Sequence, residues 1–152
     1  MVINGFIDLK EKVDTDIGNF YIGRFSKNTF INKSFDLDPF KSDLYVLMKK
    51  DSTEEMRGFC CNNEYSRYTD YDDNNKEYIS GIYISPDSDE DRYHIYKTLI
   101  SFLHEKFPDN GFIINECNHL QIEVAKELGF EVVKKIPEYG AFNCDGLLMG
   151  IK

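Results

Sequence analysis

The most constraining feature of the sequence is an alternation of strand-like and helix-like segments in its second half. Residues 78–85 (YISGIYIS) interleave Ile and Tyr as a strand does, and residues 91–107 place apolar side chains at helical spacing. Residues 112–115 (FIIN) form a short apolar strand, and a second helical pattern fills residues 118–129. Because a strand–helix–strand crossover makes its two strands parallel, the pattern predicts strands 78–85 and 112–115 as parallel neighbours.

Further strands are expected on both sides of this unit. Four segments carry strand patterns: residues 44–49, 57–62, 130–136 and 146–151. The first two are joined by a polar turn, so an antiparallel hairpin is expected there. Residues 19–24 (NFYIGR) favour another strand, and residues 35–43 a short helix or turn around Pro39. The fold class predicted from this order is α/β (α+β) with a mixed sheet.

Length and charge limit the classes of function. A chain of 152 residues with 41% hydrophobic content buries one core, so residues 1–152 are expected to form a single domain. The net charge of −9 repels a phosphate backbone, which disfavours nucleic acid as a partner and favours a cationic one. No apolar run is long enough to span a bilayer, and we expect a cytoplasmic protein that does not bind membranes.

The cysteines show no spacing typical of a metal site. None of the four belongs to a C-x-x-C motif: Cys60, Cys61, Cys117 and Cys144. Reduced, structural thiols are therefore expected. A zinc site built from these residues and His94 or His119 stays open as an alternative, but the prediction is that the chain holds no metal.

The order of elements resembles the second half of the GNAT superfamily of N-acetyltransferases. The resemblance covers about residues 44–152 and rests on element order, with a helix ending in Leu-Gly-Phe at 128–130 and a last strand containing Leu-Leu-Met at 147–149. It implies a mostly antiparallel sheet whose two central parallel strands splay apart and hold the pantetheine of acetyl coenzyme A. The residues that this assigns to the donor on the two strands are Ile82, Tyr83, Ile84 and Asn115.

The first family motif, Arg or Gln followed by x-x-Gly-x-Gly or Ala, aligns best on residues 92–97 (RYHIYK). Ile95 and Lys97 stand where the family has glycines that open backbone N–H groups to the pyrophosphate. The resemblance assigns four residues of this stretch to the donor: Arg92, Tyr93, His94 and Lys97. Four carboxylates precede the helix and would compete with an anion; alternatively they only stabilise the helix start, with Ser88 or Asp89 as the N-cap.

The second family motif, N-x-x-A-x-x-x-Y-x-x-x-G-F, places Asn118 at the asparagine, Gln121 at the alanine and Ala125 at the tyrosine that commonly protonates the leaving thiolate. Asn118, a predicted donor contact, also fits a capping pair with Gln121. With the tyrosine missing, another group must give the proton. The candidates are Cys117, Tyr139 and His119 as the acid, with Glu77 or Glu64 as a base acting through water.

Two functions follow from these observations. The first is an N-acetyltransferase that moves an acetyl group from acetyl coenzyme A to a small-molecule or peptide amine, which the acidic surface suits when the amine is cationic. The second is a GNAT-fold protein without catalysis that binds a protein or small ligand through an acidic surface rich in tyrosines, such as Tyr65, Tyr68 and Tyr71. A monomer or a homodimer is expected in either case.

Overall fold

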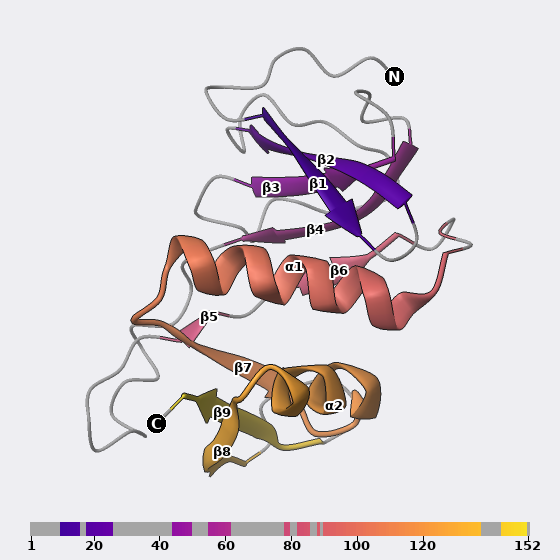
Figure 1. Ribbon diagram of the computed structural model, residues 1–152. Helices are drawn as coiled ribbons and strands as arrows, with labels where there is room; N and C mark the ends of the chain where they lie inside the picture. The colour runs from indigo at the N-terminus through magenta and orange to yellow at the C-terminus, as the bar shows by residue number, and fades with distance from the viewer. Residues whose placement is uncertain are drawn as a thin grey trace. The chain divides into compact units, whose positions relative to one another are not determined.

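The computed structural model describes the protein at residues 10–15, 18–25, 44–49, 55–61, 78–79, 82–85, 88, 90–137 and 144–151 (Figure 1). The chain divides into two compact parts, which are taken one at a time. The first comprises residues 1–62 and 81–99, and the second comprises residues 63–80 and 100–152. The boundary between them falls inside helix α1 (Arg92–Lys106).

The first part contains a five-stranded antiparallel sheet in the order β1-β2-β3-β4-β6. Its strands are β1 (Lys10–Thr15), β2 (Gly18–Phe25), β3 (Leu44–Met48), β4 (Met56–Cys61) and β6 (Ile82–Ile84). The predicted hairpin of residues 44–49 and 57–62 is confirmed by the antiparallel pairing of β3 with β4, and the strand predicted at residues 19–24 by β2. The helix or turn expected at residues 35–43 lies outside the described residues.

Gly58 of β4, which has no side chain, determines how the core of this part packs. A Cβ atom at Gly58 would lie 2.7 Å from the carbonyl oxygen of Tyr83 and 3.0 and 3.3 Å from side-chain carbons of Leu99 and Ile95. Both of these α1 residues are buried: Leu99 has no exposed surface and Ile95 is 1% exposed. The bare backbone at position 58 is what lets the first half of α1 lie close to the sheet.

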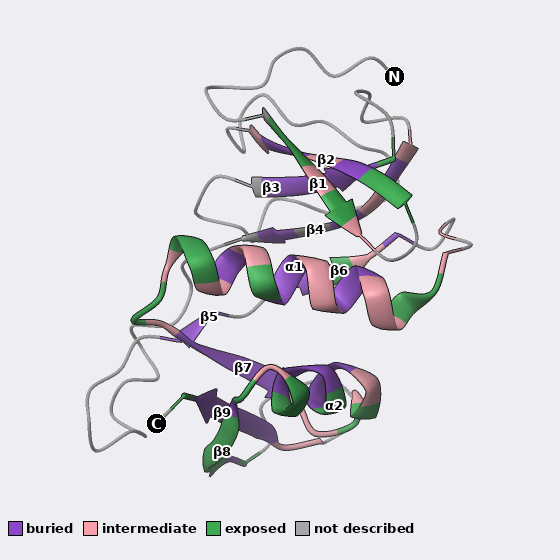
Figure 2. Ribbon diagram, in the orientation of Figure 1, coloured by how far each residue is buried: buried purple, intermediate pink, exposed green. Residues whose placement is uncertain are grey.

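The second part contains a four-stranded sheet in the order β5-β7-β9-β8. Its strands are β5 (Tyr78–Ile79), β7 (Gly111–Asn115), β8 (Glu131–Ile136) and β9 (Gly146–Gly150). Strands β5 and β7 are parallel, whereas β9 pairs antiparallel with both β7 and β8. Figure 2 shows β7 and β9 largely buried and β8 exposed.

The parallel pair that the sequence predicts is confirmed, but only over its first residues. Tyr78 lies opposite Gly111 and Ile79 opposite Phe112. After that the chain leaves β7, because Ile82–Ile84 form β6 and pair with β4 in the other sheet. The segment predicted as one strand over residues 78–85 is therefore two short strands in two sheets.

Buried aromatic rings fill the second part. Phe112 and Phe130 meet edge to face with their centroids 5.0 Å apart, and both are almost completely buried. A Cβ at Gly111 would overlap the carbonyl oxygen of Met149 and lie 2.7 Å from the ring of Tyr78, so β7 begins with the one residue that fits. Helix α2 (His119–Glu127) ends before Gly129, whose φ of 97° confirms the predicted helix-terminal glycine.

The architecture is thus a mixed α+β fold that is mostly antiparallel, with one parallel strand pair among the described strands and two helices. None of the helices that the structure describes is long and apolar enough to cross a membrane.

Candidate functional site

The N-terminus of α1 is capped by Asp91. Its carboxylate accepts a hydrogen bond from the backbone N–H of Tyr93 at 2.9 Å, and its carbonyl accepts from His94 at 3.1 Å. The prediction that Ser88 or Asp89 is the cap was therefore wrong. Ser88 instead donates its hydroxyl proton to Glu90 Oε2 over 3.1 Å, and Asp91, one residue before the helix, is the residue that reaches the second helical N–H.

Glu90, just before this helix, forms ion pairs with two positively charged side chains. Arg57 Nε lies 2.5 Å from Glu90 Oε2, and Lys49 Nζ lies 3.3 Å from Oε1. Burial raises the pKa of Glu90, but hydrogen bonds from Arg57 and Lys49 together outweigh it and lower the pKa to about 2. Glu90 is consequently ionised at neutral pH and a poor base. Its role is to fix Arg57 of β4 against the chain that enters α1.

The residues predicted to contact the donor through the first motif lie on the first two turns of α1. Arg92 is exposed, whereas Tyr93, His94 and Lys97 are partly buried. The ammonium of Lys97 lies 5.9 Å from the centre of the Tyr93 ring, one helical turn away. The structure brings these four side chains to one end of the helix, and their contact with a donor remains a prediction.

Ile95 explains why a glycine is absent from this stretch. Its side chain is 1% exposed and packs against the space left free by Gly58. Position 95 therefore serves the core of the first part. An anion that approached the backbone of α1 at this position would meet a buried aliphatic side chain instead of an open N–H.

Strand β6 carries the three donor residues predicted from the first splayed strand. Ile82 is buried, Tyr83 is 42% exposed and Ile84 is partly buried. In the described sheet β6 is the edge strand, with β4 as its one neighbour. An edge strand can bind an extended ligand through its backbone groups.

The turn between β7 and α2 carries the remaining predicted contacts. Asn115 Oδ1 accepts a hydrogen bond from the N–H of Cys117 at 2.9 Å. Asn118 Oδ1 accepts from the N–H of Gln121 at 3.2 Å, and its amide donates to Gln121 Oε1 at 2.9 Å. The capping pair expected for Asn118 and Gln121 is confirmed, and it engages both polar atoms of the Asn118 side chain.

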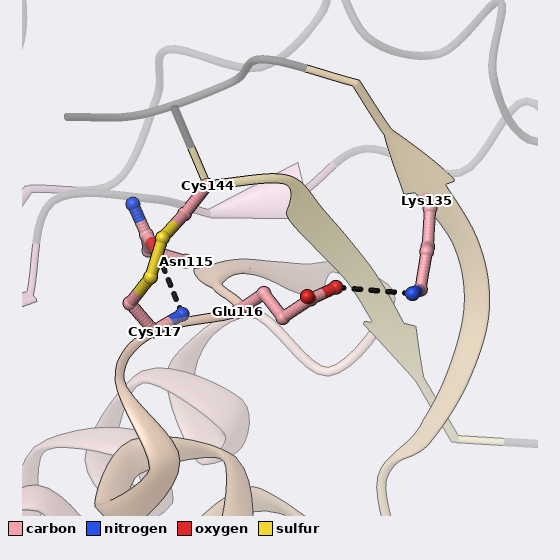
Figure 3. Close-up of a disulfide and its surroundings, with 5 residues drawn as sticks. All are labelled: Asn115, Glu116, Cys117, Lys135 and Cys144. Atoms are coloured by element: carbon pink, nitrogen blue, oxygen red, sulfur yellow. Dashed lines mark hydrogen bonds and ion pairs between the residues drawn. A yellow bond between two sulfur atoms is a disulfide. The ribbon is translucent and has the colours of Figure 1, made fainter. Parts of the chain in front are cut away.

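Cys117 and Cys144 form a disulfide, with their Cα atoms 6.2 Å apart (Figure 3). The expectation of reduced thiols is therefore wrong for these two residues, whereas Cys60 is a buried thiol that takes part in no disulfide. A disulfide sulfur has no proton to give, so Cys117 cannot be the general acid in this state. Glu116, the preceding residue, forms an ion pair with Lys135 at 3.0 Å.

The fold was compared with those of solved structures. A probable acetyltransferase of the GNAT family from Chromobacterium violaceum aligns over 98% of this chain and 88% of its own, with a TM-score of 0.57 and 13% identity. A GNAT-family acetyltransferase from Bacillus cereus aligns over 72% of this chain and 70% of its own, with a TM-score of 0.51 and 17% identity. The chain has the GNAT acetyltransferase fold. No protein-family model and no curated relative matches the sequence.

Within the GNAT fold, the position that the second motif gives to the catalytic tyrosine is filled by Ala125, which is completely buried in α2. His119, the first residue of α2, is exposed. Glu77, Glu64 and Tyr139, the other predicted acid and base groups, lie outside the described residues. Among the described residues no group of His, Cys, Asp and Glu is arranged to hold a metal ion.

Two features of the GNAT-fold chain escaped sequence reasoning. The Arg57–Glu90 pair joins residues 33 positions apart in the chain, and only the pairing of β4 with β6 brings them together. The disulfide had a signal: Cys117 is two residues past the end of β7 and Cys144 two residues before β9. Once these strands are predicted as antiparallel neighbours, the cysteines face each other.

Proposed function

We propose that residues 1–152 form one GNAT-like domain that acts as an N-acyltransferase and moves an acetyl group from acetyl coenzyme A to an amine. The observation that carries the proposal is the path of the chain around β5 and β7. These strands are parallel, the chain after β5 continues through β6 into α1, and the chain after β7 turns directly into α2. This is the arrangement that the family uses for its acyl donor.

Donor binding, as we propose it, uses β6 and the start of α1. The edge of β6 offers backbone groups to the amides of the pantetheine arm. The guanidinium of Arg92, exposed at the first residue of α1, supplies a positive charge for the pyrophosphate, and Lys97 adds a second one turn later. Asp91 opposes this, since its carboxylate occupies the N–H of Tyr93. We therefore expect weak donor binding.

The chemistry is the attack of a neutral amine on the thioester carbonyl. A carbon–nitrogen bond forms, the carbon–sulfur bond breaks, the amine loses a proton and the departing thiolate gains one. Because Ala125 has no proton to give, the described residue best suited to protonate the thiolate is His119, with Tyr139 and a reduced Cys117 as further candidates, while Glu77 is a candidate base for the amine. Without any acid, positioning of the two substrates supplies the acceleration.

The acceptor is proposed to be cationic. The net charge of −9 raises the local concentration of positively charged molecules near the protein, and an amine substrate is protonated in solution. Polyamine-like small molecules and lysine-containing peptides fit this description. A reducing, cytoplasmic setting is proposed with it, and it would make the redox state of Cys117 and Cys144 variable.

The proposal is tested by mass-spectrometric detection of acetyl transfer from acetyl coenzyme A to a panel of diamines and lysine peptides. Arg92→Gln is compared with Lys126→Gln, which removes one positive charge from an exposed position on α2. Acetylated product that decreases about tenfold or more with Arg92→Gln and stays unchanged with Lys126→Gln supports donor binding at α1. If no amine is acetylated by the wild type, reduced or oxidised, the binding-protein alternative replaces this function.

A further inference from the structure

The Cys117–Cys144 disulfide lies in register with the β7–β9 ladder. Asn115 pairs with Gly146, and the N–H of Glu116 then donates to the carbonyl of Asp145 at 2.8 Å. Cys117 and Cys144 follow as the next opposite pair, with a Cα separation of 6.2 Å that a disulfide can span. The bond therefore closes the end of the ladder at the point where the chain turns into α2 (Figure 3).

We infer that the Cys117–Cys144 pair is a reversible thiol–disulfide switch that controls the turn at residues 115–118. The consequence for donor binding rests on the proposed function, because Asn115 and Asn118 of this turn are predicted donor contacts. The switch itself rests on the position and exposure of the two cysteines. Cys117 is exposed and Cys144 partly buried, whereas Cys60, which takes part in no disulfide, is fully buried.

Besides the disulfide, hydrogen bonds and one ion pair hold this turn. Inside the turn, Asn115 accepts from the N–H of Cys117 through its side chain and from the N–H of Asn118 through its carbonyl, both at 2.9 Å. Between the turn and the strands, the N–H of Glu116 donates to the carbonyl of Asp145 and the Glu116 carboxylate pairs with Lys135. Both side chains of that ion pair are exposed to solvent, at 44% and 60%, so it adds little. The disulfide is the strongest link.

Exchange with a dithiol reductant opens this link. A thiolate of the reductant attacks the sulfur of the exposed Cys117, the sulfur–sulfur bond to Cys144 breaks, and Cys144 leaves as a thiolate that takes up a proton. The second thiol of the reductant then attacks the mixed disulfide and releases Cys117, so the protein gains two electrons and two protons while the reductant becomes a disulfide. In the oxidising direction the Cys117 thiolate attacks oxidised glutathione and releases one glutathione, and the Cys144 thiolate then attacks the mixed disulfide and releases the second.

The switch is tested first without any assay of function. The full-length protein is equilibrated in buffers with different ratios of reduced to oxidised glutathione, and alkylated cysteines are counted by mass spectrometry. We expect Cys117 and Cys144 to become alkylated together over one range of ratios, while the buried Cys60 stays unlabelled. A disulfide that survives excess dithiol in the native protein, or two thiols that remain free under oxidised glutathione, would overturn the inference.

The second test measures what the switch controls. Amide hydrogen exchange at Glu116, Cys117 and Asn118 should accelerate by about tenfold or more on reduction, with the amides of α1 as the internal control. Affinity for acetyl coenzyme A should differ between the reduced and oxidised wild type and be independent of redox state in Cys117→Ser/Cys144→Ser. Unchanged exchange refutes the switch. Redox-dependent exchange without coenzyme binding in either state refutes only the proposed function.

Discussion

The carboxylate of Asp91 accepts a hydrogen bond from the backbone N–H of Tyr93, over 2.9 Å, at the start of α1. In the family that shares this fold, N–H groups at this helix terminus grip the pyrophosphate of the donor. Here a side chain of the same charge sign as the donor already occupies one of them. This hydrogen bond places Asp91 in opposition to the donor binding that we propose.

Removing the charge of Asp91 while keeping its cap should strengthen donor binding. Asparagine is as good an N-cap as aspartate, so we expect Asp91→Asn to preserve stability and to raise affinity for acetyl coenzyme A by about two- to fivefold. Asp91→Ala should instead lose about 0.5–2 kcal/mol of unfolding free energy. Calorimetric titration and urea denaturation measure the two effects. Asp109→Asn, an exposed position after α1, is the matched control, and an equal gain there would refute the site.

Ile95 and Gly58 should be energetically coupled. A Cβ at Gly58 would lie 3.3 Å from Ile95 and 2.7 Å from the backbone oxygen of Tyr83, so Gly58→Ala should lower the free energy of unfolding by about 1–3 kcal/mol. The loss should be smaller in an Ile95→Ala background but should not vanish, because the clash with the Tyr83 backbone remains. Urea denaturation of the four proteins measures this, and strictly additive effects would contradict the packing described.

Ile95→Ala alone should cost about 2–5 kcal/mol, because it empties a fully packed position. Restoring the family's small residue at position 95 is thus expected to weaken the fold before it can help a donor. A loss below 1 kcal/mol would show that the position is not a core position.

Glu90 should make stability depend on acid pH. Its pKa falls from 4.5 to about 2 in the folded protein, so its contribution is complete above about pH 4.5 and is lost as the pH falls toward 2. The difference between those pKa values corresponds to on the order of 3 kcal/mol. We expect Glu90→Gln to be less stable than the wild type by about this amount at pH 7, with the gap closing toward pH 2. The exposed Glu105→Gln serves as control, and a gap independent of pH would argue against the ion pair.

The disulfide should contribute strongly to stability. It closes a loop with a sequence separation of 27 residues, for which chain entropy gives about 3–4 kcal/mol. Reduction of the wild type should therefore lower Tm by about 10 °C. Cys117→Ser/Cys144→Ser should show the same lower Tm with and without reductant. A wild-type Tm that is the same with and without reductant would contradict a stabilising disulfide between Cys117 and Cys144.

The sequence predicted the elements of the second half well because their signals are local. The apolar spacing of α1, the Asn118 cap and Gly129 all act within one or two turns. Local signals could not show that residues 78–85 divide between two sheets, because the division is set by long-range pairing, of Tyr78–Ile79 with β7 and of Ile82–Ile84 with β4. The cap of α1 was misplaced for a similar reason: Ser88 and Glu90 are engaged with each other and with Arg57, which leaves Asp91 to reach the helix.

For the candidate site, the sequence predicted which segments the family motifs align with, but not what the aligned residues do there. Alignment to the family motifs located the start of α1 and the turn before α2. What the aligned residues do there follows from packing that the sequence does not display: Ile95 is held in the core by the absence of a side chain at Gly58, and Ala125 is buried in α2. The disulfide was missed because its cysteines were weighed by spacing along the chain, whereas the antiparallel register of β7 and β9 brings them together.

The proposed donor binding is tested by titration calorimetry of acetyl coenzyme A into the wild-type protein, once oxidised and once reduced. We expect saturable binding with a Kd of about a millimolar or tighter in at least one state, weakened by Arg92→Gln. Absence of binding in both states, in protein that remains folded, would contradict donor recognition by this GNAT fold.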